Sequence, residues 1–269
     1  MRVGFLGPSG TFSEEATILY FANQDVERIA FPTFLDILEA LQDESIDWGV
    51  LPVENSIEGT VNAVLDGIPL FPDLFIKGQV VLNVDENLLA LHGVNMKDIK
   101  EVWSHAQPLA QCRNFIRSLG AKTKSTESTV AAAVELVKSQ RRDVAVLGTT
   151  FAAEKFALHT LAEKVQDFAE NHTRFFVVSK GHDMPSDPTK TLLLVTPSQE
   201  HAGVLVNILN VFSALNVNLT WIESRPTKRR LGEYQFFMEV ETGAADEQMK
   251  KVILILETFG HEVAVLGSY

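Results

Sequence analysis

Short apolar runs alternate with helical patterns over the first 180 residues of the chain. The apolar run at 3–6 predicts a buried strand, and the capping-box spacing of residues 11–14 predicts a helix directly after it. From residue 33 onward, apolar side chains recur at i, i+3, i+4 and i+7, which indicates a second helix. We predict further strands at 28–31, 48–53, 101–104, 122–126, 143–147 and 174–178, and further helices at 61–65, 108–119 and 128–139. This alternation predicts an α/β fold with a mostly parallel sheet.

The stretch from residue 74 to 92 has no helical pattern. Its apolar residues are spread over an extended segment, which we interpret as a crossing between two lobes. A second series of strands and helices begins after it. Pro108 suits the first turn of a helix and Gly120 suits its end. Cys112 is expected on that helix as a small packed residue.

Turn-forming residues concentrate at 181–189 and predict a linker between two domains, 1–180 and 190–269. After the linker, the pattern predicts β-α-β-β-α-β. That order is typical of the ferredoxin-like arrangement, with two helices on one face of an antiparallel sheet. The strands are expected at 191–196, 219–223, 234–240 and 262–266, and the helices near 204–215 and 246–259.

Composition narrows the class of protein. Of the 269 residues, 46% are hydrophobic and 22% are charged, which is typical of a compact globular chain. The net charge of −12 disfavours nucleic acid and anionic membranes as partners. No segment reaches the roughly 18 apolar residues of a membrane span, and the apolar stretch at the start is too short for a signal peptide. A single cysteine fits a reducing cytoplasm, and we predict no metal site because the histidines form no ligand cluster.

Polar residues follow several of the predicted strands, where ligands of open α/β sheets bind. Hydroxyl and amide side chains dominate, and such groups suit an anionic small molecule that helix N-termini also hold. The same residue types are the preferred N-caps of helices, so a purely structural role stays open for each cluster. The clusters lie at 7–11, 54–56, 104–107, 127–129, 148–150 and 171–173.

Taken together, these motifs resemble the prephenate dehydratase family over nearly the whole chain. Within the first domain, the resemblance rests on GPSGTFSE at 7–14, PVENSIEGTV at 52–61, SH at 104–105, QP at 107–108, QC at 111–112, EST at 127–129 and TRF at 173–175. Within the second domain, NLT at 218–220 and ESRP at 223–226 resemble the phenylalanine-binding ACT domain that this family carries at its C-terminus.

The resemblance implies a two-lobed catalytic region similar to periplasmic binding proteins, with lobe one at about 1–75 and 170–180 and lobe two at about 80–165. It implies conversion of prephenate to phenylpyruvate, CO2 and water in L-phenylalanine biosynthesis, with no cofactor. Aromatisation drives this reaction, and its barrier lies in expelling hydroxide, so a proton or hydrogen-bond donor at that hydroxyl is the main requirement. Arogenate dehydratase and a catalytically silent ligand-sensing protein of the same fold remain alternatives. The silent protein would have no need of the Thr-Arg-Phe triplet.

The resemblance also implies roles for single residues. Thr173 is expected to donate to the departing hydroxyl, and Glu54 and Glu127 are the other catalytic candidates. These two carboxylates fit beside a dianionic substrate only if they are protonated or held back from it. The residues expected to bind the substrate are Thr11, Asn55, Ser56, Ser104, Gln111, Arg174 and Phe175.

The resemblance further implies feedback inhibition by phenylalanine, which binds at a separate site between two ACT domains and therefore requires a homodimer or homotetramer. Gly203 would let the backbone approach the ligand carboxylate, and Glu223 would receive its ammonium group. The family's usual Pro-Gly-Ala-Leu turn appears here as Ala-Gly-Val-Leu. The candidate phenylalanine-binding residues are Ala202, Gly203, Val204, Leu205, Asn218, Leu219, Glu223 and Ser224.

Overall fold

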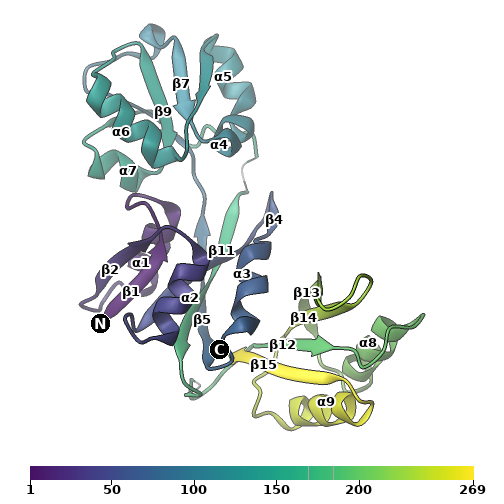
Figure 1. Cartoon of the computed structure of the whole chain (residues 1–269). Coiled ribbons are helices and arrows are strands. Elements are labelled where there is room, and N and C mark those ends of the chain that lie inside the picture. The colour runs from purple at the N-terminus through teal and green to yellow at the C-terminus, as the bar shows by residue number, and fades with distance from the viewer. Residues whose placement is uncertain (169, 184) are drawn as a thin grey trace. The chain divides into compact units, whose positions relative to one another are not determined.

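The computed structural model describes residues 1–168, 170–183 and 185–269 (Figure 1). Ala169, in the predicted catalytic region, and Met184, in the predicted linker, lie outside the described residues. Among the described residues, no helix combines the length and hydrophobicity that crossing a membrane requires. The contacts form two compact units. Unit 1 comprises Met1–Ile37, Gly49–Val64 and Val80–Phe175, and unit 2 comprises Leu38–Trp48, Leu65–Gln79 and Phe176–Tyr269.

The first part of the chain confirms the predicted alternation of strands and helices. Its elements are β1 (Arg2–Leu6), α1 (Phe12–Tyr20), β2 (Glu27–Phe31), α2 (Phe34–Gln42), β3 (Trp48–Asn55), β4 (Gly59–Thr60), α3 (Asn62–Gly67) and the 3-10 helix η1 (Ile68–Leu70). β1 and β2 pair in parallel, and β3 lies between β1 and β11 (His172–Lys180). The residues after β3 turn back on themselves, and Glu54 and Asn55 pair antiparallel with Thr60 and Gly59 of β4 in a tight hairpin.

A second sheet of unit 1 has the strand order β10-β6-β9-β7-β8. It is reached through β5 (Leu74–Asn83), which agrees with the extended stretch predicted at 74–92. Its elements are β6 (Asn87–Ala90), the 3-10 helix η2 (Met96–Asp98), β7 (Glu101–Ser104), α4 (Ala106–Gln111), α5 (Arg113–Leu119), β8 (Lys122–Ser125), α6 (Thr129–Ser139), β9 (Val144–Gly148), α7 (Thr150–Lys155) and β10 (His159–Ala162). The pattern predicted neither α7 nor β10.

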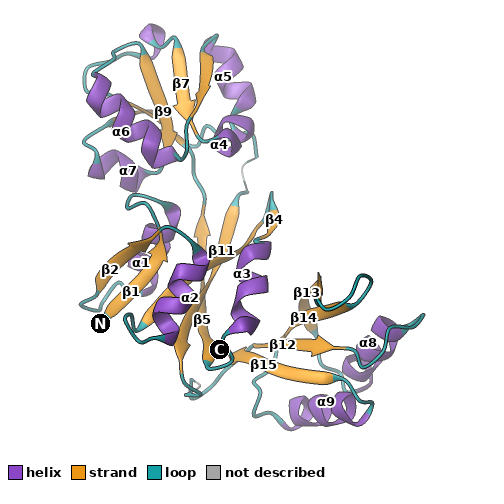
Figure 2. Ribbon diagram, in the orientation of Figure 1, coloured by secondary structure: helices purple, strands orange, loops and turns teal. Residues whose placement is uncertain are grey.

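Helices cover both faces of this second sheet (Figure 2). Successive strand residues point to opposite faces, so the adjacent Leu88 and Leu89 belong to two separate apolar clusters. One cluster includes Ile116 of α5, and the other includes Ala132 and Leu136 of α6. Strands buried on both faces are continuously apolar, which is the pattern that the sequence shows here.

Two details of this region differ from the sequence-based expectations. The sheet is mixed, because β6 runs antiparallel to β9 while β7 runs parallel to it. β6 is followed by a turn and η2 without a crossover helix, which allows the reversal. The single helix predicted at 108–119 is two helices that meet at Cys112, whose backbone leaves the helical conformation at φ −109° and ψ 21°. The apolar spacing of Leu109, Cys112 and Ile116 continues across the break and conceals it.

Unit 2 contains the predicted β-α-β-β-α-β order in its C-terminal part. The elements are β12 (Thr191–Thr196), α8 (Val204–Ala214), β13 (Leu219–Pro226), β14 (Tyr234–Val240), α9 (Glu247–Thr258) and β15 (Glu262–Ser268). The strands pair antiparallel in the order β13-β14-β12-β15. Ile208 of α8 and Val252 of α9 share one core with strand residues such as Leu193 and Met238. β15 also pairs in parallel with β5, where Gly267 lies opposite Ile76.

Candidate active site

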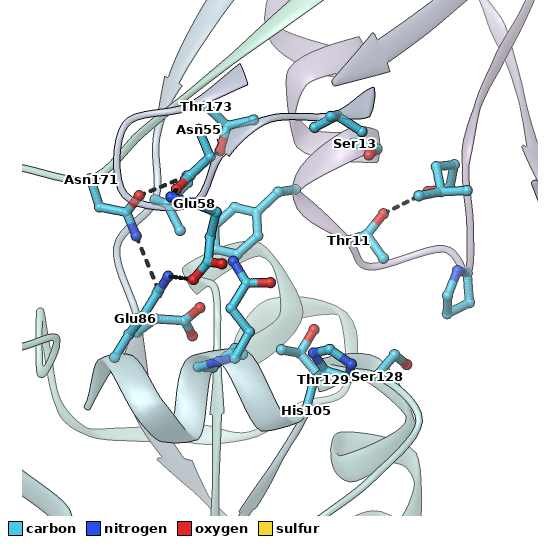
Figure 3. Close-up of a pocket in the computed structure, with 18 of the residues that line it drawn as sticks. Thr11, Ser13, Asn55, Glu58, Glu86, His105, Ser128, Thr129, Asn171 and Thr173 are labelled. Atoms are coloured by element: carbon cyan, nitrogen blue, oxygen red, sulfur yellow. Dashed lines mark hydrogen bonds between the residues drawn. The ribbon is translucent and has the colours of Figure 1, made fainter. Parts of the chain in front are cut away.

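The candidate active site is a cavity of about 490 Å³ that is lined entirely by residues of unit 1 (Figure 3). Six segments contribute to it: the β1–α1 turn, the β3–β4 hairpin, the residues between β5 and β6, and the first residues of α4, α6 and β11. No lysine or arginine is among the described lining residues. The titratable side chains in the lining are Glu58, Glu86, His105 and Glu127.

The β1–α1 turn is held by a buried carboxylate. Gly10 takes a positive φ of 107° and donates its N–H to Glu14 Oε2 at 2.7 Å. Ser9 Oγ donates to the same oxygen, and Lys155 Nζ lies 3.2 Å from it. Burial alone would raise the pKa of Glu14, but these hydrogen bonds outweigh it and lower that pKa. The turn is therefore fixed by an ionised side chain that is not part of the cavity lining.

The predicted capping box of α1 is not formed, although the helix begins where expected. The carboxylate of Glu14 accepts the Gly10 N–H instead of the Thr11 N–H that a capping box requires. The hydroxyl of Thr11 donates to Leu6 O at 3.1 Å and caps no helical N–H. Phe12 and Ser13, the first residues of the helix, line the cavity. The positive end of the α1 dipole thus lies at the cavity without a side-chain cap.

A chain of amide side chains runs along one side of the cavity. Asn55 Nδ2 donates to Thr173 Oγ1 at 3.0 Å and to Asn171 Oδ1 at 2.8 Å. Asn171 Nδ2 donates to Gln111 Oε1 at 3.2 Å, and Gln111 Nε2 donates to Glu58 Oε1 at 3.4 Å. The side-chain oxygen of Asn55, Oδ1, accepts the backbone N–H groups of Ile57 and Glu58 in the β3–β4 turn, which fixes the orientation of the side-chain amide. Figure 3 shows Asn55, Thr173, Asn171 and Glu58 grouped together, with Thr11 and Thr129 across the cavity in this view.

The start of α6 supplies a second helix N-terminus. Ser128 is the N-cap residue, and its hydroxyl accepts the Ala131 N–H at 3.0 Å. Glu127 and Thr129 flank it, and all three consecutive residues line the cavity. Within the described part of the chain, no group of three or more His, Cys, Asp or Glu residues is arranged to hold a metal ion.

The candidate residues divide into two sets by position. Thr11, Asn55, Gln111, Glu127 and Thr173 line the cavity, whereas Glu54, Ser56, Ser104, Arg174 and Phe175 do not.

Strand geometry explains part of this division. Successive strand residues point to opposite faces, so Asn55 and Thr173 meet at the cavity while their neighbours Glu54 and Arg174 pair at 3.1 Å on the other face.

The other outlying candidates have different surroundings. Ser56 is engaged by the backbone before β11, since its hydroxyl accepts the His172 N–H at 2.9 Å. Ser104 and Phe175 are buried, and the hydroxyl of Ser104 has no hydrogen-bond partner among the described residues.

Several lining residues were not among the candidates. Asn171, His105, Gln107, Ser128 and Thr129 all fall in the polar clusters that follow or precede predicted strands, so position along the sheet was a usable signal for them. Glu58 falls within one of the family-like motifs. Glu86 had no local signal, since it lies in the extended stretch between two strands.

The candidate phenylalanine-binding residues form two groups within one chain. Gly203, at φ +89°, is the N-cap of α8, and Val204 begins that helix. Asn218 follows the other end of α8 and donates to Glu241 Oε2 at 2.8 Å. The 11 residues of α8 therefore separate the two groups. Leu205 and Leu219 pack against the same apolar core, and Glu223 and Ser224 lie further along β13, while Ala202 is exposed.

Comparison with known proteins gives a consistent result. The family model of prephenate dehydratase matches residues 3–183. A prephenate dehydratase of Methanocaldococcus jannaschii is 34% identical over 266 residues, which cover 97% of this chain and 95% of that protein. The crystal structure of the prephenate dehydratase from Staphylococcus aureus superposes with a TM-score of 0.91 at 32% identity and covers 100% of both chains.

A further solved structure, the prephenate dehydratase of Arthrobacter aurescens in complex with L-Phe, also has a TM-score of 0.91 at 32% identity. It covers 100% of this chain and 89% of that one. The α/β fold with mixed sheets is thus the fold of prephenate dehydratase structures over the full length. Sequence and fold together show that this chain belongs to the prephenate dehydratase family.

Proposed function

We propose that this protein is a prephenate dehydratase, a carbon–oxygen lyase that converts prephenate to phenylpyruvate, CO2 and water in L-phenylalanine biosynthesis. Its relatives of that name match almost the whole chain. The observation that carries the proposal is the Thr173 hydroxyl, which lines the cavity and accepts a hydrogen bond from Asn55 Nδ2 at 3.0 Å.

The reaction requires a proton or hydrogen-bond donor at the leaving hydroxyl. Because Asn55 donates to Thr173 Oγ1, the hydrogen of that hydroxyl is left to donate elsewhere, and the amide polarises it. An aliphatic hydroxyl is a weak acid, so Thr173 acts as a hydrogen-bond donor to the departing oxygen. Departure of that oxygen is coupled to loss of CO2, and the electron pair of the broken C–C bond completes the aromatic ring.

The two carboxylates of the substrate need an anion-binding surface without lysine or arginine. The N-termini of α1 and α6 both reach the cavity, and their backbone N–H groups and dipoles suit carboxylates. Thr11 and Gln111 add neutral donors beside them. We place Glu127 at the edge of this surface, and Glu54, Ser56, Ser104, Arg174 and Phe175 in positions that support it from outside the cavity lining.

The regulatory part of the proposal concerns the C-terminal region. We propose a catalytic region at 1–180 built from the two lobes predicted above, a linker at 181–189, and a regulatory ACT domain at 190–269. In a cytoplasmic homodimer or homotetramer, this domain binds phenylalanine, and the bound phenylalanine inhibits the enzyme. The β-α-β-β-α-β order supports the ACT assignment, and α8 keeps the two groups of candidate residues apart in one chain, which favours a site shared between two copies.

One assay tests the catalytic proposal. Purified protein is incubated separately with prephenate and with arogenate, and phenylpyruvate and phenylalanine are measured independently. Phenylpyruvate from prephenate is the expected result, phenylalanine from arogenate would indicate arogenate dehydratase, and no product from either would indicate a silent ligand-sensing protein.

Replacement of Thr173 tests the role of the hydroxyl. Thr173→Ala is expected to lower kcat by about 10²–10⁴-fold with a smaller change in KM, and Thr173→Ser is expected to restore part of kcat. Thr160→Ala in β10, outside the cavity lining, is the control. If Thr173→Ala kept nearly the wild-type kcat, the assigned role would be wrong.

A further inference from the structure

Three glutamates in the described part of the chain are less than a tenth exposed: Glu14, Glu86 and Glu239. Two of them are well satisfied. Glu14 has the donors described above, and Glu239 accepts from Lys190 Nζ at 2.8 Å and from Tyr269 Oη at 2.7 Å. Glu86 is different, because its Oε2 has no hydrogen-bond partner among the described residues. A buried polar atom without a partner is rare in a folded protein and calls for a physical reason.

The position of Glu86 supplies a physical reason for its unpartnered oxygen. It follows β5, precedes β6 and is 1% exposed, yet it is part of the cavity lining. Its backbone is fixed, since its N–H donates to Gln166 Oε1 at 3.1 Å and its carbonyl accepts the Val165 N–H at 2.8 Å. Figure 3 shows its carboxyl group on the same side of the cavity as Glu58 and Asn171. The backbone of Glu86 is thus fixed, and its carboxyl group belongs to the lining of the cavity where a substrate would bind.

The charged groups around Glu86 leave it without a cation. Lys164 forms an ion pair with Asp85, the residue before Glu86, with 3.1 Å between Lys164 Nζ and Asp85 Oδ2. Glu58 on the β3–β4 hairpin faces the same cavity and accepts from Gln111. The other titratable side chains on the elements packed here are Glu15 of α1, His105 at the start of α4, Cys112 at the α4–α5 junction, Glu127 before α6, and Asp167.

We propose that Glu86 is a catalytic acid of this site, whose neutral carboxyl group supplies the proton with which the hydroxyl of prephenate departs as water. The inference rests on the proposed prephenate dehydratase function. It follows from the placement of an unpartnered, buried carboxyl group in the lining of the cavity, beside the amide chain that ends at Thr173. The burial of the group supports it, because burial raises the pKa of Glu86 to about 7, so that about half of the carboxyl groups are protonated at pH 7.

The step balances in atoms and charge. The O–H proton of Glu86 passes to the hydroxyl oxygen of prephenate as its C–O bond breaks, and the C–C bond to the ring carboxylate breaks with release of CO2. The electron pair of that C–C bond enters the ring, and water and phenylpyruvate leave. Glu86 remains as a carboxylate and regains its proton from solvent. The departing oxygen has two lone pairs, so Thr173 donates a hydrogen bond to one while Glu86 protonates the other.

This role predicts a specific pH dependence. The acid works only in its protonated form, so kcat/KM of the wild type is expected to fall as pH rises through about 7. Glu86→Gln is expected to lower kcat by about 10²–10⁴-fold and to remove that alkaline fall together with the solvent deuterium isotope effect on kcat.

Glu15→Gln is the matched control. Glu15 is a partly buried glutamate that shares with Glu86 an unpartnered Oε2 and a raised pKa, which burial and then Asp85 raise in Glu15. Unlike Glu86, it does not line the cavity. This variant is expected to keep both the rate and the pH profile. If Glu86→Gln instead retained kcat within a few-fold and kept the alkaline limb while the wild type turned prephenate over, Glu86 would not be the acid and the proposed function would stand.

Absence of wild-type turnover on prephenate would overturn the function and this role together. Should Glu86→Gln fold poorly, carbon-13 NMR of labelled glutamate carboxyl groups in the wild type provides the decisive measurement, with Glu86→Asp assigning the signal. A midpoint near 7 supports the proposal, and a midpoint near the ordinary value of 4.5 overturns it.

Discussion

The side-chain amide of Asn55 orients several groups around the candidate site. We predict that Asn55→Asp lowers kcat by about 10²-fold, because an oxygen then faces Thr173 Oγ1 and Asn171 Oδ1 where a donor stood. Steady-state kinetics with prephenate measure this. Asn95→Asp, outside the cavity lining, is the control and is expected to keep the wild-type kcat. Equal rates for both variants would contradict the assigned hydrogen-bond chain.

Burial of Glu86 also has a consequence for stability. Its pKa is raised from 4.5 to about 7, so the folded state binds more protons than the unfolded state between those values. Stability of the wild type therefore falls as pH rises through this window, by up to about 3 kcal/mol from this group. Glu86→Gln removes that loss. The free energy of unfolding in urea, measured at pH 5 and pH 8, tests this, with Glu27→Gln at an exposed position as the control. If the free energy of unfolding of Glu86→Gln depended on pH as strongly as that of the wild type, the prediction would be wrong.

At the scale of elements, the pairing of β15 with β5 depends on a glycine. A Cβ atom added at Gly267 would lie 2.3 Å from Ile76 O, and this contact involves backbone that cannot rotate away. We predict that Gly267→Ala destabilises the protein by about 1–3 kcal/mol. Urea denaturation measures the effect, and Glu262→Ala at the exposed start of β15 should change the midpoint little. An unchanged urea midpoint for Gly267→Ala would mean that the pairing of β15 with β5 does not depend on this glycine, which contradicts the prediction.

A comparison of individual strands and helices shows where apolar periodicity predicts secondary structure correctly and where it does not. The strands at 101–104 and 191–196 were predicted with their observed bounds, and the second of them is a buried strand with four consecutive apolar residues at 192–195. The break at Cys112 escaped prediction, since the helical spacing of apolar residues continues through it. The reversal of β6 escaped as well, because strand direction depends on the route of the connecting segment, which apolar periodicity does not encode.

At the scale of the whole molecule, one ion pair offers a route between the proposed regulatory region and the site. Arg225 of β13 donates to both carboxylate oxygens of Asp66 at 2.9 Å, and these bonds lower the pKa of Asp66. Asp66 lies in α3, a helix that begins two residues after Thr60 of the cavity lining. A change at β13 can therefore act on α3 and through it on the β3–β4 hairpin.

We predict that Asp66→Asn raises the phenylalanine concentration for half-inhibition by about 5–150-fold, which corresponds to a coupling of 1–3 kcal/mol, while activity without phenylalanine is kept. Inhibition curves with prephenate measure it, and Asp73→Asn, an exposed residue of unit 2, is the control. Unchanged inhibition would exclude this ion pair from the coupling. Full sensitivity after deletion of residues 190–269 would instead place phenylalanine in the catalytic region.

The sequence by itself determined most of the order of strands and helices, with α7 and β10 the exceptions, because local apolar periodicity and turn residues depend on neighbours along the chain. Its motifs also pointed to Asn55 and Thr173, which the structure places in contact. Only the tertiary structure decided that Glu54 and Arg174 pair outside the cavity, since this follows from how two distant strands face one another. It alone revealed Glu86, because burial of a carboxyl group without a partner is set by segments far apart in the chain.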